Sequence, residues 1–294
     1  MKYGEPLKRY TTLRIGGRAD WLIEPKNDSE MKQLLEMAQA ENIPWFVLGR
    51  GSNLLVSDRG LRGMVFHLSS LRSPITIKRF NNGQLLLEVD AGFPLSKLVR
   101  FGIDNRLGGL EFLAGIPGSM GGAWAMNAGS YGKEIKDITA YLITISSGGR
   151  LIRKGKKELE FGYRNLKLEA GEVILSGGIK LSSGEAEVIR KETQRLWRQR
   201  RVAQPLNRSS CGSVFKNPPD DFAGRLIEKT GLKGVRKGGA QISTHHANFI
   251  VNRGEARAAD VLYLMNLIRT RVKEQFGILL EPEVRLWGCS LKEI

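Results

Sequence analysis

The chain has 294 residues, a length typical of two domains with room for a third small one. Its hydrophobic (41%) and charged (26%) fractions are those of an ordinary globular protein, which excludes a disordered or fibrous chain. Basic residues exceed acidic ones by 16 charges, so polyanions are the expected partners: nucleic acid, membrane phosphate or phosphate-bearing small molecules.

Neither a membrane nor a nucleic acid is expected as a partner. The sequence contains no run of about 18 apolar residues and no apolar targeting core near residue 1, which indicates a cytoplasmic location. The densest basic segment, 190–201, also carries Leu196 and Trp197, so it predicts an amphipathic helix with a solvated face. A nucleic-acid reader needs a recognisable module or interleaved aromatics, and aromatic residues make up only 7% of the chain. Cys211 and Cys289 lack metal-ligand spacing and are expected as reduced, buried thiols.

The first 70 residues alternate between strand and helix signals. Asp28 and Ser29 are N-cap residue types, and the apolar residues that follow as far as Ala38 recur at helical spacing. Short apolar runs predict strands at 21–23, 45–48, 54–56 and 64–66. This segment therefore has β-α-β character, with a glycine loop at 49–53.

Beyond residue 70 the pattern indicates α+β structure with short turns. Strands are expected at 75–77, 85–89 and 140–145, and a helix at 94–104 with Pro94 in its first position. After the basic helix, the pattern predicts strands near Ser213 and at 241–243, and helices at 222–229 and 256–275.

The first glycine loop is the run Gly49-Arg50-Gly51-Ser52-Asn53. It begins like a dinucleotide-binding motif, but Leu54 stands where the third glycine belongs and a strand follows instead of a helix, which excludes a Rossmann fold. Two interpretations remain: an anion-binding nest of backbone N–H groups, and a plain β-turn.

The second glycine cluster spans residues 114–123, where seven of ten residues are Gly, Ala or Pro. Missing side chains indicate either that a bulky group approaches the backbone or that neighbouring elements pack closely. Two such loops in a basic chain favour one extended phosphate-bearing cofactor, and FAD fits that description.

Three residues could carry chemistry. Ser213 lies beside glycine outside any GxSxG elbow, and His67, His245 and His246 have no spacing that makes them its general base or a metal site. A turn residue is the alternative interpretation of this serine.

Arg164 lies in an expected loop, where its guanidinium could grip a carboxylate or form a surface ion pair. Glu283 follows Pro282 in an expected C-terminal strand and faces either solvent or a cleft. None of the three decides the function alone.

Taken together, nine segments resemble the UDP-N-acetylenolpyruvoylglucosamine reductase family, and they occur in the family's order from residue 11 to residue 288. The segments are TTLRIGG, LGRGSNLLVSD, LAGIPGSMGGAWAMNAG, FGYRNL, CGSVFKNP, AGRLIEKTGLKG, GAQIS, HANFIVN and LEPEVRLWG. The resemblance thus covers nearly the whole chain.

The resemblance implies an α+β fold: an FAD-binding module of the vanillyl-alcohol-oxidase (PCMH) type, made of two subdomains, and a C-terminal α+β substrate-binding domain. The implied boundaries are 1–68, 69–185 and 186–283, with a strand at about 284–294 returning to the first subdomain. FAD would be held non-covalently between the first two, with NADPH as co-substrate and no metal.

The resemblance also implies the site residues. The catalytic positions are Arg164, Ser213 and Glu283. Cofactor contacts fall on Gly49, Arg50, Gly51, Ser52, Asn53, Leu54, Gly115, Ile116, Pro117, Gly118, Ser119, Gly122 and Asn127. Substrate contacts fall on Tyr163, Lys216, Asn217 and His246, with packing as the alternative for His246 and its neighbour His245.

The implied reaction reduces UDP-N-acetylglucosamine enolpyruvate to UDP-N-acetylmuramate for peptidoglycan. NADPH reduces the flavin, which passes hydride to the enolpyruvyl methylene carbon; Arg164 and Glu283 stabilise the enolate-like species, and Ser213 protonates its α-carbon. The chain resembles the family's shorter form, with little room after FGYRNL for a substrate-covering loop, and a monomer or weak oligomer is expected. The alternatives are another FAD oxidoreductase of this fold and a basic nucleic-acid-binding protein. Oxidases of this fold often tether flavin through a histidine, and the only early candidate, His67, lies outside both glycine loops.

Overall fold

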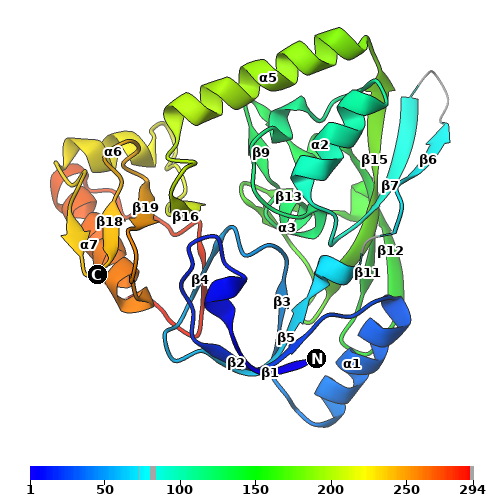
Figure 1. Cartoon of the computed structure of the whole chain (residues 1–294), viewed down its shortest axis with the longest axis horizontal. Helices are drawn as coiled ribbons and strands as arrows, with labels where there is room; N and C mark the ends of the chain where they lie inside the picture. Colours follow the sequence, from blue (N-terminus) through cyan, green and yellow to red (C-terminus); the bar gives the residue numbers. More distant parts are fainter. Residues whose placement is uncertain (72, 80–83, 292–294) are drawn as a thin grey trace. The chain divides into compact units, whose positions relative to one another are not determined.

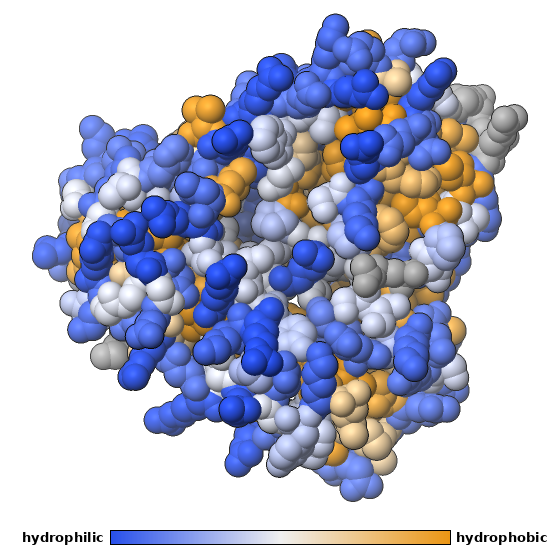
Figure 2. All heavy atoms as spheres, in the orientation of Figure 1, coloured by the Kyte–Doolittle hydropathy of each residue, from blue (hydrophilic) through white to orange (hydrophobic). Residues whose placement is uncertain are grey.

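The computed structural model describes residues 1–71, 73–79 and 84–291. The chain forms two compact units: one comprises Met1, Leu22–Arg50 and Gly63–Arg200, and the other Lys2–Trp21, Gly51–Arg62 and Arg201–Ile294. Hydrophilic residues cover most of the face drawn in Figure 2, as the high content of charged residues predicts. Among the described residues, no helix has both the length and the apolar character needed to cross a membrane.

An antiparallel sheet dominates the unit that contains Gly63–Arg200 (Figure 1). Its strands run in the order β12, β11, β15, β7, β6, and β8 also pairs with β15. Their bounds are β6 Thr76–Arg79, β7 Gln84–Asp90, β8 Leu107–Gly108, β11 Thr139–Ile145, β12 Leu151–Gly155 and β15 Val173–Ser183.

The sequence pattern does not predict the central strand β15, because the strand contains Gly177 and Gly178 and glycine is a poor strand former. A Cβ on Gly177 would lie 2.8 Å from the Trp124 ring, and one on Gly178 would lie 2.3 Å from the Tyr141 ring. These glycines therefore make room for two large side chains that pack on the strand.

The remaining elements of this unit lie outside this sheet. They are α1 Asp28–Ala40, β3 Trp45–Leu48, α2 Leu95–Asp104, α3 Met120–Ala125, β9 Gly129–Ser130, β10 Lys133–Glu134, α4 Ile135–Ile138, β13 Phe161–Gly162 and β14 Asn165–Leu166. Strand β5, Leu61–His67, pairs in parallel with β3 through residues 64–67. Helix α5, Ala186–Ala203, begins in this unit, as do short 3-10 turns at 68–70, 111–113 and 156–158.

The predicted N-termini of two helices were wrong by a residue or two. Helix α1 is capped by Asn27, whose side chain accepts a 2.9 Å hydrogen bond from the Glu30 amide, not by Asp28 or Ser29. Helix α2 starts at Leu95, and Pro94 has extended backbone as its N-cap. Helix α1 therefore begins one or two residues earlier than predicted, and helix α2 begins one residue later.

The second unit contains a four-stranded antiparallel sheet in the order β16, β19, β18, β17, together with helices α6 and α7 (Figure 1). The bounds are β16 Ser209–Ser213, α6 Ala223–Lys229, β17 Arg236–Lys237, β18 Ala240–Ile242, β19 Phe249–Asn252 and α7 Ala258–Phe276. Strand β4, Leu54–Val56, pairs in parallel with β20, Arg285–Trp287. Near the N-terminus lie β1 Lys2–Pro6, a 3-10 turn at 7–9 and β2 Arg18–Ile23, which crosses the division between the units.

One hydrophobic core joins segments of this unit that are far apart in the sequence. Leu13, Ile15 and Leu55 share a buried cluster with the inner face of α7, which includes Val261 and Ile268. The first 60 residues therefore supply part of the C-terminal core.

Asp58 fixes the start of α7 across 200 residues of sequence. Its two carboxylate oxygens accept hydrogen bonds from the amides of Ala258 (2.8 Å) and Ala259 (3.1 Å). Because these amides have no partner within the helix, we expect Asp58→Ala to cost about 1 kcal/mol of stability, read as a lower midpoint of thermal unfolding. Asp104→Ala, which removes an exposed i,i+4 partner of Arg100, is the control and should cost less than about 0.5 kcal/mol. Equal shifts in both variants would rule out the capping role.

Candidate active site

The end of β3 and the second glycine cluster meet at Gly49 and Ser119. A Cβ on Gly49 would lie 2.6 Å from the Ser119 hydroxyl oxygen, and one on Gly122 would lie 3.6 Å from it. Ser119 is 2% exposed, and its hydroxyl oxygen is buried without a hydrogen-bond partner among the described residues. An orphaned buried hydroxyl costs about 1–3 kcal/mol, so this position suits a ligand that supplies a polar atom.

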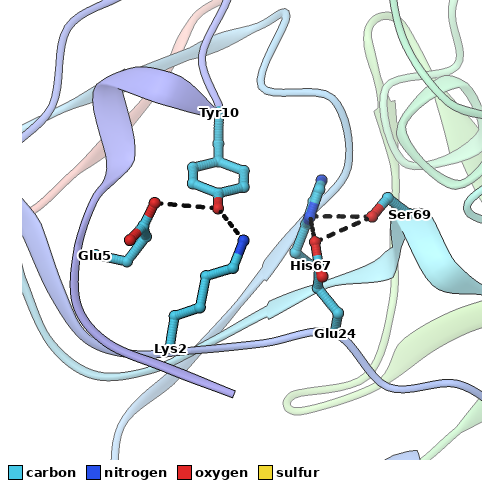
Figure 3. Close-up of polar contacts among 6 residues, drawn as sticks. All are labelled: Lys2, Glu5, Tyr10, Glu24, His67 and Ser69. Carbon is cyan, nitrogen blue, oxygen red and sulfur yellow. Dashed lines mark hydrogen bonds and ion pairs between the residues drawn. The ribbon is translucent and has the colours of Figure 1, made fainter.

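Gly51 has a packing requirement of its own. Its φ is +58°, and an added Cβ would lie 2.1 Å from the Tyr10 carbonyl oxygen. Tyr10 is itself held by its side chain, because its hydroxyl accepts a hydrogen bond from Lys2 (2.7 Å) and donates one to Glu5 (3.2 Å), as Figure 3 shows. Close backbone approach is therefore sufficient to explain this glycine.

Thr12 ties this loop to the strand that carries Ser213. Its amide donates to the Gly51 carbonyl (3.1 Å), and its hydroxyl is 2.6 Å from the Ser210 carbonyl. No sequence pattern indicates a role for Thr12, because its partners lie 39 and 198 residues away.

Arg200 supports the second glycine cluster from helix α5. Its Nε donates to the Ala114 carbonyl (3.0 Å), and its side chain lies against Gly115, whose φ is +76°. Burial lowers the pKa of Arg200, and the charge of Arg164 lowers it further. The predicted solvated face of the basic segment is therefore wrong for Arg200, which is 9% exposed. Its position four residues after Leu196, on the apolar face, could have signalled this.

Arg164 lies at the tip of a two-residue hairpin. Phe161 pairs with Leu166 and Gly162 with Asn165, so Tyr163 and Arg164 form the turn. The guanidinium carbon of Arg164 is 5.2 Å from the centre of the Tyr163 ring. Arg164 has a φ of +53°, a conformation that costs a residue other than glycine about 1–3 kcal/mol. Arg14 and Arg106 share this conformation, so the strain by itself does not assign a function to Arg164.

Ser213 ends β16 next to a bulge. The register with β19 shifts between Ser210 and Ser213, and Gly212 has a φ of +79°. Burial, together with the nearby Glu283 charge, raises the pKa of the Cys211 thiol to about 12, so this thiol stays protonated. A bulge re-aims the side chain beside it, and here that side chain is the partly exposed Ser213.

Glu283 is held beside the residue that follows Ser213. The Glu283 amide donates to the Val214 carbonyl (2.9 Å), and the Asn53 side-chain amide donates to the Glu283 carbonyl (3.0 Å). The structure therefore brings Ser213, Glu283 and Asn53 together in one unit. Arg164 belongs to the other unit, so the convergence of the three residues predicted to be catalytic stays a proposal.

The predicted substrate contacts already have protein partners. Lys216 forms an ion pair with Glu281 (3.2 Å), and the Asn217 side chain accepts a hydrogen bond from the Ala223 amide at the start of α6 (3.1 Å). His246 accepts a hydrogen bond at Nδ1 from the Asn248 amide (3.2 Å).

The surroundings of His246 favour its neutral form. Its ring lies edge-on to Phe249 at 4.9 Å, and burial, followed by the charge of His245, lowers its pKa. His246 is therefore a neutral imidazole with Nδ1 as an acceptor.

Asn248 fixes the chain beyond Ser213, a role that no sequence motif indicated. It is 3% exposed and exchanges two side-chain hydrogen bonds with the Phe215 backbone, at 3.0 and 2.8 Å. This role can be recognised only from the contact with Phe215, which lies 33 residues away in the sequence.

His67, Glu24 and Ser69 form a polar cluster after the end of β5 (Figure 3). His67 Nδ1 is 2.9 Å from a Glu24 carboxylate oxygen and 3.1 Å from the Ser69 hydroxyl. In a catalytic triad one ring nitrogen of the histidine contacts the serine and the other contacts the carboxylate. Here both contacts are made at Nδ1, so the cluster is not a catalytic triad. Because Nδ1 is engaged by both neighbours, the cluster gives no support to flavin attachment through this nitrogen.

Two family models match separate parts of the chain. Residues 19–155 match the family described as "FAD binding domain", and residues 204–287 match "UDP-N-acetylenolpyruvoylglucosamine reductase, C-terminal domain". A UDP-N-acetylenolpyruvoylglucosamine reductase of Syntrophus aciditrophicus is 43% identical over 286 residues, covering 97% of this chain and 91% of that protein. The reductase of Streptococcus thermophilus is 43% identical over 292 residues, covering 99% and 94%.

A solved structure has the same fold over nearly the whole chain. The crystal structure of the UDP-N-acetylenolpyruvylglucosamine reductase from Thermus caldophilus is 38% identical, with a TM-score of 0.81, and covers 97% of this chain and 98% of that one. The α+β fold expected from the sequence, an FAD-binding module followed by the reductase's C-terminal domain, is confirmed. The chain belongs to the UDP-N-acetylenolpyruvoylglucosamine reductase family.

Proposed function

We propose that this chain reduces UDP-N-acetylglucosamine enolpyruvate to UDP-N-acetylmuramate, a step in making peptidoglycan precursors, with FAD as cofactor and NADPH as reductant. The observation that carries the proposal is 43% identity to reductases of this name over at least 97% of the chain. The Glu283 amide donates to the carbonyl of Val214, the residue after Ser213, and this pairing supports the proposal that the side chains of Ser213 and Glu283 act in one site.

The residues around Gly49 fit the cofactor. The buried, unpartnered Ser119 hydroxyl offers a donor to a phosphate or hydroxyl oxygen, and Gly49 and Gly122 leave the backbone bare beside it. FAD, when bound there, would accept two electrons from NADPH and deliver hydride to the substrate. The other predicted cofactor residues, from Arg50 to Leu54 and from Gly115 to Gly118, stay proposals.

The chain's own residues would stabilise the negative charge that develops on the substrate and supply the proton that completes its reduction. Arg164 would stabilise the enolate-like substrate carboxylate, because a guanidinium keeps its charge and presents two parallel N–H groups, and Glu283 would lie near the reacting carbon. Ser213 would donate its hydroxyl proton to the α-carbon. A serine is a weak acid, but an enolate carbon is strongly basic, so placement decides the rate.

The predicted substrate contacts, partners, location and oligomeric state follow from the proposed substrates. Tyr163, Lys216, Asn217 and His246 are proposed to face the UDP-sugar. Both substrates are phosphate-bearing small molecules, which accounts for part of the positive charge and makes a nucleic-acid partner unnecessary. We infer a cytoplasmic enzyme, where such nucleotides occur, and a monomer or weak oligomer.

The division into 1–68, 69–185 and 186–283, with 284–294 returning to the first subdomain, also stays a proposal. The pairing of β20 with β4 supports the last point.

The test uses purified protein. A flavin absorption spectrum that NADPH bleaches anaerobically, and that the enolpyruvyl UDP-sugar restores with formation of the muramate product, is expected. Free FAD should be released on denaturation, because no covalent link is proposed. A colourless protein that cannot be loaded with FAD, or reduced flavin that the enolpyruvyl substrate leaves reduced, would refute the function.

Ser119→Ala should have opposite effects on the two forms of the protein. In the FAD-free protein it removes an unpartnered hydroxyl, so the unfolding midpoint should stay or rise. FAD should bind about 5- to 10-fold more weakly, the loss of one hydrogen bond of about 1–1.5 kcal/mol. Titration calorimetry on the apoprotein measures this change, and Ser147→Ala, a serine in a turn, serves as control. Unchanged FAD affinity would exclude the contact.

A further inference from the structure

Asn127 ends helix α3 and is completely buried. Its φ is +40°; its amide donates to the Trp124 carbonyl (3.0 Å) and the next amide, of Ala128, donates to the Ala123 carbonyl (2.8 Å). This is the hydrogen-bond pattern of a Schellman motif, in which glycine is the usual residue and asparagine an accepted one. The backbone of Asn127 therefore needs only a residue that tolerates a left-handed conformation.

The side chain of Asn127 makes contacts that the helix cap does not require. Its Nδ2 donates to the Gly162 carbonyl (2.9 Å) and to the Glu134 carboxylate (3.0 Å), and its Oδ1 accepts from the Lys136 amide (3.2 Å). Both amide hydrogens and the oxygen are thus used within the protein. This arrangement leaves no side-chain donor for FAD, in contrast to the cofactor contact that the resemblance implies for Asn127.

Gly162 is the residue immediately before the turn that carries Arg164. The hairpin has only two residue pairs, and so short a hairpin is marginal without outside support. Arg164 also occupies a left-handed conformation, which persists only where surrounding contacts enforce it. Asn127 supplies such a contact at the base of the turn.

We propose that Asn127 is a positioning residue for the reduction of the enolpyruvyl group: its side chain anchors the Arg164 hairpin to the end of α3, whose start lies in the second glycine cluster. The proposal rests on the reductase function. Asn127 then acts through Arg164 and touches neither cofactor nor substrate.

Asn127→Gly separates the two roles, because glycine preserves the helix cap and removes the side chain. Flavin affinity and the rate of flavin reduction by NADPH should stay within about 2-fold, while reoxidation by the enolpyruvyl substrate slows about 10- to 100-fold, as expected for a misplaced catalytic group. Asn42→Gly is a matched control. Asn42 ends α1 in the same hydrogen-bond pattern with a φ of +52°, and it is exposed.

Two further measurements distinguish positioning from a loss of general stability. Hydrogen exchange of residues 161–166 in the FAD-free protein should become faster in Asn127→Gly and stay unchanged in Asn42→Gly. In an Arg164→Ala background, Asn127→Gly should slow flavin reoxidation by less than about 2-fold further, because residues that act as a unit are not additive.

If Asn127→Gly does not fold, Asn127→Asp is the second variant, since it keeps the size and left-handed tolerance but replaces a donor with an acceptor. Weaker FAD binding, parallel loss of both half-reactions, or additive effects with Arg164→Ala would overturn the positioning role. Wild-type protein that fails to turn over the enolpyruvyl substrate would instead refute the reductase function, and the exchange measurement would still test the hairpin contact.

Discussion

Ser213→Ala is expected to leave flavin reduction by NADPH intact and to slow substrate reduction by about 10²- to 10⁴-fold, the usual contribution of a general acid. NADPH must reduce the flavin without a proton from Ser213, whereas completion of the substrate reaction requires one at the α-carbon. Anaerobic stopped-flow measurement of flavin absorbance, with product analysis after mixing with substrate, separates the two half-reactions.

Ser209→Ala is the control for the serine variant, since Ser209 lies at the other end of the same strand and pairs with Asn252. It should change neither half-reaction by more than about 2-fold. Equal loss of both half-reactions in Ser213→Ala would show that the serine supports the structure or the cofactor and is not the proton donor. A normal rate of product formation would remove Ser213 from the mechanism.

Arg164→Gly should abolish most activity without loss of stability. Loss of one group that stabilises a developing negative charge costs about 10²- to 10³-fold in rate. Arg164 has a φ of +53°, so glycine relieves backbone strain, and the free energy of unfolding should stay the same or rise by up to about 1 kcal/mol. Steady-state kinetics and thermal unfolding of the same preparations test both parts.

Arg106→Gly provides the matched comparison for Arg164. Arg106 follows α2 with a φ of +57° and is exposed, so the same substitution should stabilise the protein to a similar extent with unchanged turnover. Arg164→Lys should recover only part of the rate, because an ammonium keeps the charge but not the two parallel N–H groups. If Arg164→Gly loses stability as well as activity, the strained turn is not an adaptation for catalysis.

Two short apolar runs predicted their strands closely. The strands expected at 45–48 and 54–56 have those bounds as β3 and β4. The first run lies between Pro44 and Gly49, and the second is buried throughout. Prediction failed where a neighbour overrode local preference. Gly177 and Gly178 argue against a strand, yet they lie in β15 because Trp124 and Tyr141 fill the space beside them.

Ordered sequence motifs were enough to predict the family, the fold class and the residues proposed for catalysis, since these motifs record chemistry that only certain residue types can perform. The residues that hold the proposed catalytic residues in place could be found only in the folded structure. Asn127 reaches Gly162 and Thr12 reaches Ser210, contacts that span 35 and 198 residues. The physical reason is that a buried polar group must find a partner wherever the folded chain supplies one, and separation along the sequence does not reveal that partner.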